Sequence, residues 1–288
     1  MLPIPGSGRV TVAVPAPGAG AGCWAGAPSA VLDDDGAVVL AYRLRDVERR
    51  GAEVVIARGE SLARVVSLDK DHFGAESLER PAMVRTDDGW RLYVCCATPG
   101  SKHWWIDALD APDLGGLGQA EPVTVFPGDA STGVKDPVVR RFEHGWRAWI
   151  CCHPLEDPGE EDRMTTALAT SEDGLEWAWQ GTVLAPRPGE WDARGARVTA
   201  VLADGTVFYD GRATKEENFS ERTGVVGRHA PVAGVRYLDV LALPGGGWRL
   251  FYEAPLPDGS HELRSELVPA QGPRATRRRA RATRDASP

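Results

Sequence analysis

Residues 81–97 read PAMVRTDDGWRLYVCCA, two apolar segments separated by the turn sequence Asp87-Asp88-Gly89. An Asp-Gly turn between two such segments is a strong local signal for a β-hairpin. The same arrangement recurs along the chain, and each copy keeps an interval of eight residues between its first strand and its turn glycine. The five copies run from Pro28 to Gly36, Pro81 to Gly89, Pro137 to Gly145, Arg197 to Gly205 and Asp239 to Gly247.

Tryptophan directly follows three of these turn glycines, at Trp90, Trp146 and Trp248. A hairpin repeat that starts every ~40–60 residues is typical of a β-propeller. The sequence therefore predicts an all-β fold, a five-bladed β-propeller, as a single domain over residues 1–270. The alternating segment 9–14 has no hairpin partner, and we expect it to pair with the last blade and close the ring.

The formal charge of −8 argues against a general nucleic-acid-binding protein. The basic run at Arg277, Arg278 and Arg279 lies in a Pro/Ala/Thr-rich stretch, so we expect residues 271–288 to be a disordered tail, with nucleic-acid or membrane contact as the alternative. The chain lacks a charged N-terminal segment followed by an apolar one, and no apolar stretch approaches ~18 residues. We expect a cytoplasmic protein with neither nucleic acid nor membrane as a partner.

Four of the five cysteines form two adjacent pairs, Cys95-Cys96 and Cys151-Cys152, at similar distances after Trp90 and Trp146. This position predicts buried, reduced residues in the second strand of each hairpin rather than a metal site. The six histidines show no HxH or HExxH spacing. We therefore expect no metal and no cofactor, with a carboxylate-bound Ca²⁺ on the axis as the alternative.

Three stretches carry a family resemblance. Residues 167–177, ALATSEDGLEW, together with 181–184 resemble a recurring blade end in the five-bladed glycoside hydrolase superfamily of families 43, 32, 62 and 130. Lys135-Asp136-Pro137 resembles the third-blade start of those families, whose aspartate stabilises the transition state or tunes the acid. Glu79-Arg80-Pro81 is similar to the Glu-Asp-Pro start of blade 2 in the family 130 phosphorylases.

This resemblance covers roughly residues 24–268 and implies a carbohydrate-active enzyme. Such an enzyme would cleave a glycoside or sugar-like small molecule in the central funnel, by hydrolysis or by phosphorolysis. The alternatives are a non-catalytic sugar-binding propeller, and a repurposed lyase, isomerase or cyclase that acts on a non-sugar metabolite.

Several catalytic carboxylates of the superfamily are missing from this chain. The start of blade 1 reads WAGAP over residues 24–28, with no base or nucleophile, and Arg80 stands where family 130 has its proton-donating aspartate. Near the expected general-acid glutamate of blade 4, the closest acids are Glu190 and Asp192. Because ordinary glycoside hydrolysis needs two carboxyl groups beside the bond, either other acids act here or the reaction differs.

The candidate site residues are those expected at the funnel ends of the strands. We predict that Asp136 orients and stabilises the reacting sugar, with Asp192 or Glu79 as the proton donor. The predicted substrate-binding residues are Arg80, Lys135, His153, Arg194, Arg212, Arg236, Asp239, Arg43 and Trp24, with Asp210 and Glu253 beside them. The basic members could hold phosphate as a nucleophile or bind a substrate carboxylate. The alternative for the whole set is structural ion pairs between blades.

Overall fold

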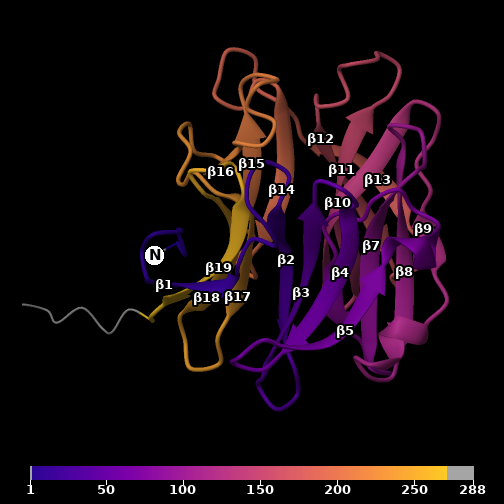
Figure 1. Ribbon diagram of the computed structural model, residues 1–288, viewed down its shortest axis with the longest axis vertical. Helices are drawn as coiled ribbons and strands as arrows, with labels where there is room; N and C mark the ends of the chain where they lie inside the picture. Colours follow the sequence, from indigo (N-terminus) through magenta and orange to yellow (C-terminus); the bar gives the residue numbers. More distant parts are fainter. Residues whose placement is uncertain (1, 271–288) are drawn as a thin grey trace, which may run out of the picture.

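The computed structural model describes residues 2–270, and the strands fall into consecutive antiparallel groups (Figure 1). Group 1 holds β2 (Trp24–Leu32), β3 (Val38–Asp46), β4 (Arg50–Arg58) and β5 (Ala63–Asp69). Group 2 holds β6 (Ala82–Arg85), β7 (Trp90–Ala97), β8 (Trp104–Ala111) and β9 (Val123–Phe126). Group 3 holds β10 (Thr132–Phe142), β11 (Gly145–Pro154), β12 (Thr165–Ser171) and β13 (Ala178–Leu184).

The second half of the chain continues this pattern with shorter groups. Group 4 holds β14 (Gly195–Val201), β15 (Val207–Arg212) and β16 (Arg222–Val225). Group 5 holds β17 (Arg236–Ala242), β18 (Trp248–Pro255) and β19 (His261–Val268). Two short 3₁₀ helices, η1 (Lys70–Phe73) and η2 (Gly116–Gln119), lie in the connections of groups 1 and 2. No helix within residues 2–270 is both long and apolar enough to cross a bilayer.

The first strands of the groups contact one another in a closed ring, β2 with β6, β6 with β10, β10 with β14, β14 with β17, and β17 with β2. The all-β propeller expected from the sequence is therefore confirmed. The strands form four sheets, because a bridge between His261 and Trp24 joins groups 5 and 1 into one sheet. The division into five blades, and the single domain ending at residue 270, stay predictions; the tail 271–288 lies outside the described residues.

Strand β1 (Arg9–Val14) pairs antiparallel with β19, from Arg9 opposite Leu267 to Val14 opposite Leu263. An N-terminal strand therefore completes the last group, as the alternating segment predicts. This pairing covers the outer edge of β19, which would otherwise expose unpaired backbone groups.

The expected hairpins form between the first and second strands of all five groups. Their turn glycines have φ of 81° at Gly36, 144° at Gly89, 120° at Gly145, 86° at Gly205 and 82° at Gly247, a region that favours glycine. At Gly89 an added Cβ would lie 2.2 Å from the carbonyl oxygen of Ala111. Only glycine fits there, for steric as well as conformational reasons.

Bulges interrupt the first strand of groups 1, 3 and 5 at corresponding places. The register shifts between Gly26 and Ser29, between Lys135 and Val138, and between Arg236 and Asp239. A left-handed residue sits in each bulge, with φ of 53° at Ala27, 51° at Asp136 and 51° at Tyr237. A β-bulge re-aims side chains, and strained non-glycine backbone of this kind concentrates at functional sites.

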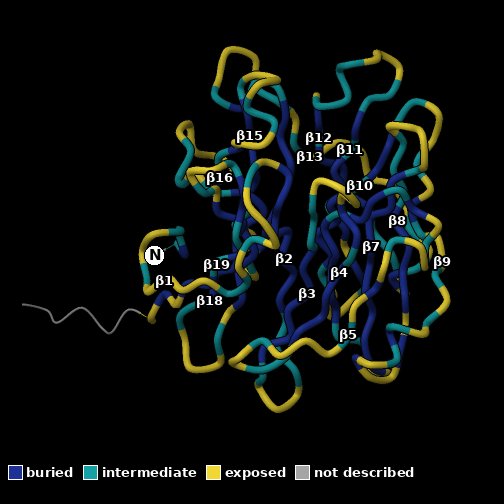
Figure 2. The backbone as a smooth tube through the Cα atoms, viewed as in Figure 1, coloured by how far each residue is buried: buried dark blue, intermediate teal, exposed yellow. Residues whose placement is uncertain are grey.

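Apolar side chains from neighbouring groups pack together between the sheets, where the backbone is buried (Figure 2). Val39 and Ile56 of group 1, for example, share a cluster with Leu92 and Leu109 of group 2. The vicinal cysteines lie in β7 and β11, the second strands of their groups, and all five cysteines are free. The predicted strand position of the cysteine pairs is confirmed, and Cys95, Cys96 and Cys151 are buried while Cys152 is partly buried.

Candidate functional site

A cavity of 490 Å³ lies where the first strands of the groups meet. Its volume falls in the range usual for small-molecule sites, about 300–1,000 Å³. Every group contributes to its lining: Trp24 and Arg43 from group 1, Glu79 and Trp104 from group 2, Lys135 and His153 from group 3, Arg197 and Arg212 from group 4, and Arg236 and Tyr237 from group 5. The cavity therefore occupies the axis, where the sequence places the site.

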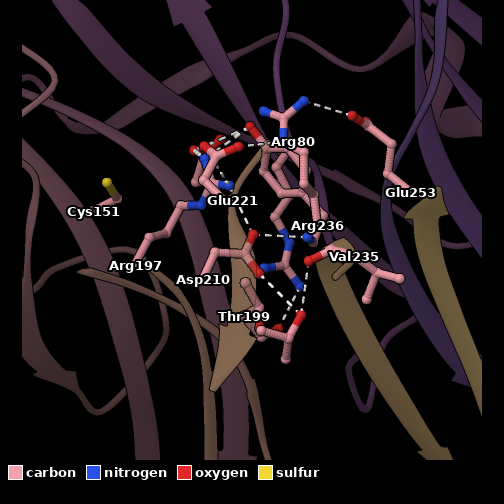
Figure 3. Close-up of polar contacts among 12 residues, drawn as sticks. Arg80, Cys151, Arg197, Thr199, Asp210, Glu221, Val235, Arg236 and Glu253 are labelled. Atoms are coloured by element: carbon pink, nitrogen blue, oxygen red, sulfur yellow. Dashed lines mark hydrogen bonds and ion pairs between the residues drawn. The ribbon is translucent and has the colours of Figure 1, made fainter. Parts of the chain in front are cut away.

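A chain of ion pairs runs along the floor of this cavity, and Figure 3 shows three of its members, Glu221, Arg236 and Glu253. Glu253 binds Arg43 through Oε2 at 2.7 Å and Arg236 through Oε1 at 2.7 Å. Arg236 Nε lies 2.6 Å from Glu221 Oε2, and Glu221 Oε1 accepts from Arg212 Nη1 at 3.0 Å. Burial disfavours the charged form of Glu253, but Arg236 and Arg43 outweigh this and lower its pKa to about 2. Glu253 therefore remains ionised at neutral pH, and the paired groups hold one another in place.

Arg197 organises the second half of the floor. Its Nη1 donates to Asp136 Oδ2 at 2.9 Å and to Tyr237 Oη at 2.9 Å, and its Nη2 donates to Asp210 Oδ2 at 2.8 Å. Tyr237 in turn donates to Asp136 Oδ2 at 3.4 Å. The two left-handed bulge residues of groups 3 and 5 thus meet on one guanidinium.

Asp136 is fully buried beside Lys135, whose Nζ lies 3.8 Å from Oδ2. Burial opposes ionisation, but Lys135 and Arg197 together hold the pKa of this carboxyl well below its usual range. Oδ1 has no hydrogen-bond partner among the described residues. Asp136 is thus a permanently charged group directly behind the cavity lining rather than a proton carrier.

His153 is buried and uncharged. Its Nδ1 donates to the carbonyl of Glu161, and its Nε2 lies 3.7 Å from Cys151 Sγ. Burial, reinforced by Lys135, lowers the pKa of this imidazole to about 3. At neutral pH it can offer a ligand only a neutral ring.

Aromatic rings form part of the cavity wall. Trp24 stacks on His261 with 5.1 Å between ring centroids, and Phe219 lies 4.8 Å from the Trp24 ring. Phe219 belongs to the connection between β15 and β16, which therefore reaches from group 4 to group 1. Lys135 Nζ lies 4.9 Å from the centroid of Trp104. Such rings offer apolar faces on which a sugar can stack.

The structure brings together more than half of the residues predicted for the site. Seven of them line the cavity: Glu79, Lys135, His153, Arg212, Arg236, Arg43 and Trp24. The other five lie behind or away from its wall: Asp136, Asp192, Arg80, Arg194 and Asp239. Their contacts explain the difference.

Asp192 binds Arg187 Nε through Oδ2 at 2.9 Å and accepts from Tyr209 Oη at 2.9 Å. Arg194 is held by Glu160 and Asp162 at 2.9 Å and 2.7 Å.

Arg80 and Asp239 are also buried. Arg80 is 2% exposed, and its Nη2 donates to the Thr199 carbonyl of group 4 at 2.6 Å. Asp239 accepts from the Ala30 backbone amide at 2.7 Å. Both make contacts that connect one group to another.

The sequence predictions did not include Arg197, Glu221, Tyr237 or Phe219 among the site residues. Tyr237 occupies the same bulge position in group 5 as Asp136 in group 3. The group 5 hairpin is one residue longer, so counting eight residues back from its turn glycine does not align Tyr237 with Asp136. Glu221 and Phe219 belong to a charged connection of irregular backbone, whose course no hydrophobic pattern indicates.

No group of three or more His, Cys, Asp or Glu side chains within residues 2–270 is arranged to hold a metal ion. The carboxylates nearest the axis each have at least one oxygen bound to an arginine.

Comparison with protein-family models and with curated proteins finds no match. Among solved structures, the chain is similar to the family GH43_1 enzyme from Xanthomonas citri in complex with xylose, at 14% identity and a TM-score of 0.63, over 91% of this chain and 90% of that one. It is also similar to an α-L-arabinofuranosidase from Lactobacillus brevis, at 15% identity and a TM-score of 0.62, over 84% and 90%.

A third similar structure comes from the GH130 mannoside phosphorylase family, described as containing hydrolases that target β-1,2 mannosidic linkages in Candida mannan. It matches at 14% identity and a TM-score of 0.61, over 95% of this chain and 97% of that one. At these identities the likeness shows the fold. The chain therefore has the β-propeller fold of these glycosidases and phosphorylases.

Proposed function

We propose that the protein is a carbohydrate-active propeller that takes a sugar or glycoside into its central cavity. The observation that carries this proposal is the cavity on the axis, where aromatic rings lie beside rigidly held arginine and carboxylate groups. Preorganised polar groups with apolar faces are what recognition of a polyhydroxylated ring requires. The fold shared with xylose-binding and mannoside-cleaving proteins supports this proposal.

For glycoside cleavage, Glu79 is the best-supported proton donor. It lines the cavity, its side chain is 13% exposed, and Arg43 Nη1 is its ion-pair partner at 2.9 Å. Asp136 would stabilise positive charge at the sugar ring through its fixed negative charge. Asp192 remains a candidate donor, but Arg187 and Tyr209 hold it away from the cavity wall.

Ordinary hydrolysis needs a second carboxylate that can act as base or nucleophile. The other buried carboxylates of the floor, Glu221 and Glu253, each bind arginines. This arrangement favours a reaction with a single acid, such as phosphorolysis, in which phosphate attacks and no base carboxylate is needed. Sugar binding without catalysis is the second candidate, and the arginine pairing of nearly every acid favours it.

A screen of nitrophenyl glycosides, with and without phosphate, tests the enzyme proposal, while calorimetric titration with the same sugars tests binding. We expect Glu79→Gln to lower turnover by at least ~10²-fold and to leave sugar binding within a few-fold of the original. Asp192→Asn is the matched control, because this acid is paired outside the cavity. If Asp192→Asn alone abolished turnover, the donor assignment would reverse.

Two further results are decisive. If a sugar binds but is not turned over, either with or without phosphate, the non-catalytic alternative is correct. If no sugar in the screen binds to the folded protein, the carbohydrate proposal itself is wrong.

A further inference from the structure

The charged groups at the floor of the central cavity are all paired, and the carboxylates outnumber the arginines by one. Four buried arginines, Arg43, Arg197, Arg212 and Arg236, meet five carboxylates, Glu79, Asp136, Asp210, Glu221 and Glu253. The floor therefore carries no surplus positive charge. A neutral or hydroxyl-bearing ligand part fits there without an uncompensated ion.

At the mouth of the same cavity, positive side chains outnumber negative ones. Four cations line it, one from each of the first four groups: Arg45 on β3, Lys102 between β7 and β8, Lys135 on β10, and Lys215 between β15 and β16. Within residues 2–270, Arg45, Lys102 and Lys215 have no carboxylate within ion-pair distance. Lys135 has Asp136 at 3.8 Å, but Arg197 already holds that carboxylate oxygen at 2.9 Å.

The hydrogen bonds that these cations make are with carbonyl groups, and Arg45 also lies over the Trp24 ring, 4.6 Å from its centroid. Arg45 Nη1 donates to the Gly22 carbonyl at 3.1 Å, and Lys215 Nζ donates to the Gly159 carbonyl at 2.7 Å. Glu161 is the one lining carboxylate without an ion-pair partner in the described part of the chain, and it accepts from the Gly159 amide at 3.0 Å. The mouth thus holds three cations without an ion-pair partner among the described residues, and a fourth, Lys135, that shares Asp136 with Arg197, against one unpaired carboxylate.

This surplus is local, because the whole chain has a net charge of −8. Like charges gathered in a concave site repel one another, and the site focuses a positive potential onto whatever enters. Arg50 lines the same cavity but forms an ion pair with Glu76. A cation at this mouth can therefore be neutralised by a carboxylate of the protein itself, without a ligand.

We propose that the sugar taken by this cavity carries its own anionic group, a carboxylate or a phosphate, and that Arg45, Lys102, Lys135 and Lys215 bind that group at the mouth. This inference rests on the proposed function. Charge-assisted hydrogen bonds from lysine and arginine to such an anion are roughly twice as strong as neutral ones. The Lys135 ammonium over the Trp104 ring would let one sugar stack on the indole while its anion meets the cation.

Calorimetric titration with matched acidic and neutral sugars tests the inference. The probes are glucuronate against glucose, galacturonate against galactose, glucose 6-phosphate, and inorganic phosphate alone, each at low and at 0.5 M salt. We expect an acidic sugar to bind at least ~10-fold more tightly than its neutral counterpart, and salt to reduce that difference. A uronate advantage identifies a carboxylate ligand, and a sugar-phosphate advantage identifies a phosphate ligand.

Lys102→Gln and Lys135→Gln should each lower affinity for the acidic sugar by at least ~5-fold and leave affinity for the neutral sugar unchanged. Lys102 is exposed, so its variant should fold normally. Arg50→Gln is the matched control, because Arg50 lines the cavity but pairs with Glu76. The Arg50→Gln variant should bind the acidic and the neutral sugar with the same affinities as the original chain.

Each contrary outcome has a distinct meaning. Equal affinity for acidic and neutral sugars overturns the inference and leaves the proposed function in place. Inorganic phosphate could instead bind as tightly as the sugar phosphate, while the uronates bind no more tightly than their neutral counterparts. That result would show that the sugar does not carry the anion, and it would also overturn the inference. Failure of every sugar to bind removes the proposed function, and the inference with it.

Discussion

Asp136 shows how a single residue carries both strain and charge in this propeller. Its backbone is left-handed with φ of 51°, and its buried carboxylate binds Arg197 at 2.9 Å. Its backbone amide donates to Cys95 Sγ at 2.9 Å. The surrounding structure therefore holds a conformation that an isolated aspartate seldom adopts.

Asp136→Asn should destabilise the protein. The substitution keeps the shape of the side chain but removes the charge that compensates buried Arg197 and Lys135, which costs about 3 kcal/mol. Urea unfolding followed by fluorescence measures this loss. Asp87→Asn is the control, because Asp87 pairs with Arg141 in an exposed position and little change is expected. If Asp136→Asn instead keeps its stability but loses ligand binding or turnover, the carboxylate acts on the ligand rather than on the fold.

His153 should make the stability depend on pH between about 4.5 and 6.5. Its folded-state pKa of about 3 lies below the ordinary value of 6.5, so the unfolded chain binds a proton that the folded chain excludes. Its contribution is complete above pH 6.5 and declines as the pH falls toward 3, at up to about 1.4 kcal/mol per pH unit. Asp136 and Glu253, with lowered pKa values, stabilise the fold at neutral pH, and their contributions are lost only at more acidic pH, below their ordinary pKa values of 3.8 and 4.5.

Urea midpoints at several pH values, for the original chain and for His153→Asn, measure this effect. The variant should show a shallower decline between pH 6.5 and 4.5. An identical slope would show that His153 is not the group responsible.

The hairpin is the element that the whole fold repeats, and its turns differ in how strictly they require glycine. Gly36→Ala should cost about 1 kcal/mol, because φ is 81° but no atom lies within 4 Å of the added Cβ. Gly89→Ala should cost clearly more, because its Cβ would meet the Ala111 carbonyl oxygen at 2.2 Å. Thermal unfolding of the two variants gives the order directly. Equal losses would mean that the β8 end simply moves aside.

The hairpins and their turns could be predicted because each depends on local residue pattern, and the pairing of segment 9–14 because a propeller needs its last edge covered. The site could be predicted only in part, because its geometry depends on bulges and on ion pairs between distant groups. Arg197 and Asp136 are 61 residues apart, yet they form one pair. Asp192 follows a loop whose backbone turns it toward Arg187, and no spacing rule indicates that direction.

At the scale of the whole molecule, the ring depends on how its last group is finished. Strand β1 covers the edge of β19, and the residues before it bind Glu266, a fully buried carboxylate. Glu266 accepts from the Gly6 amide at 2.8 Å, from the Gly8 amide, and from Tyr252 Oη at 3.0 Å. The N-terminal segment therefore contributes hydrogen bonds to a buried charge, although most of the side chains of β1 are exposed.

Removing residues 1–14 should lower the melting temperature by about 5–10 °C. The deletion leaves the Glu266 carboxylate without its two backbone donors, and each hydrogen bond to a charged group contributes about 1.5–3 kcal/mol. It also exposes the edge of β19, so light scattering should detect association of the truncated chain. Glu266→Gln separates the two effects, because it removes the charge and keeps β1 in place. That variant should be less stable than the original chain, but its light scattering should equal that of the original chain. If the truncated chain melts at the original temperature, β1 is an accessory strand and the contacts of group 5 with β2, including the bridge between His261 and Trp24, are enough to close the ring.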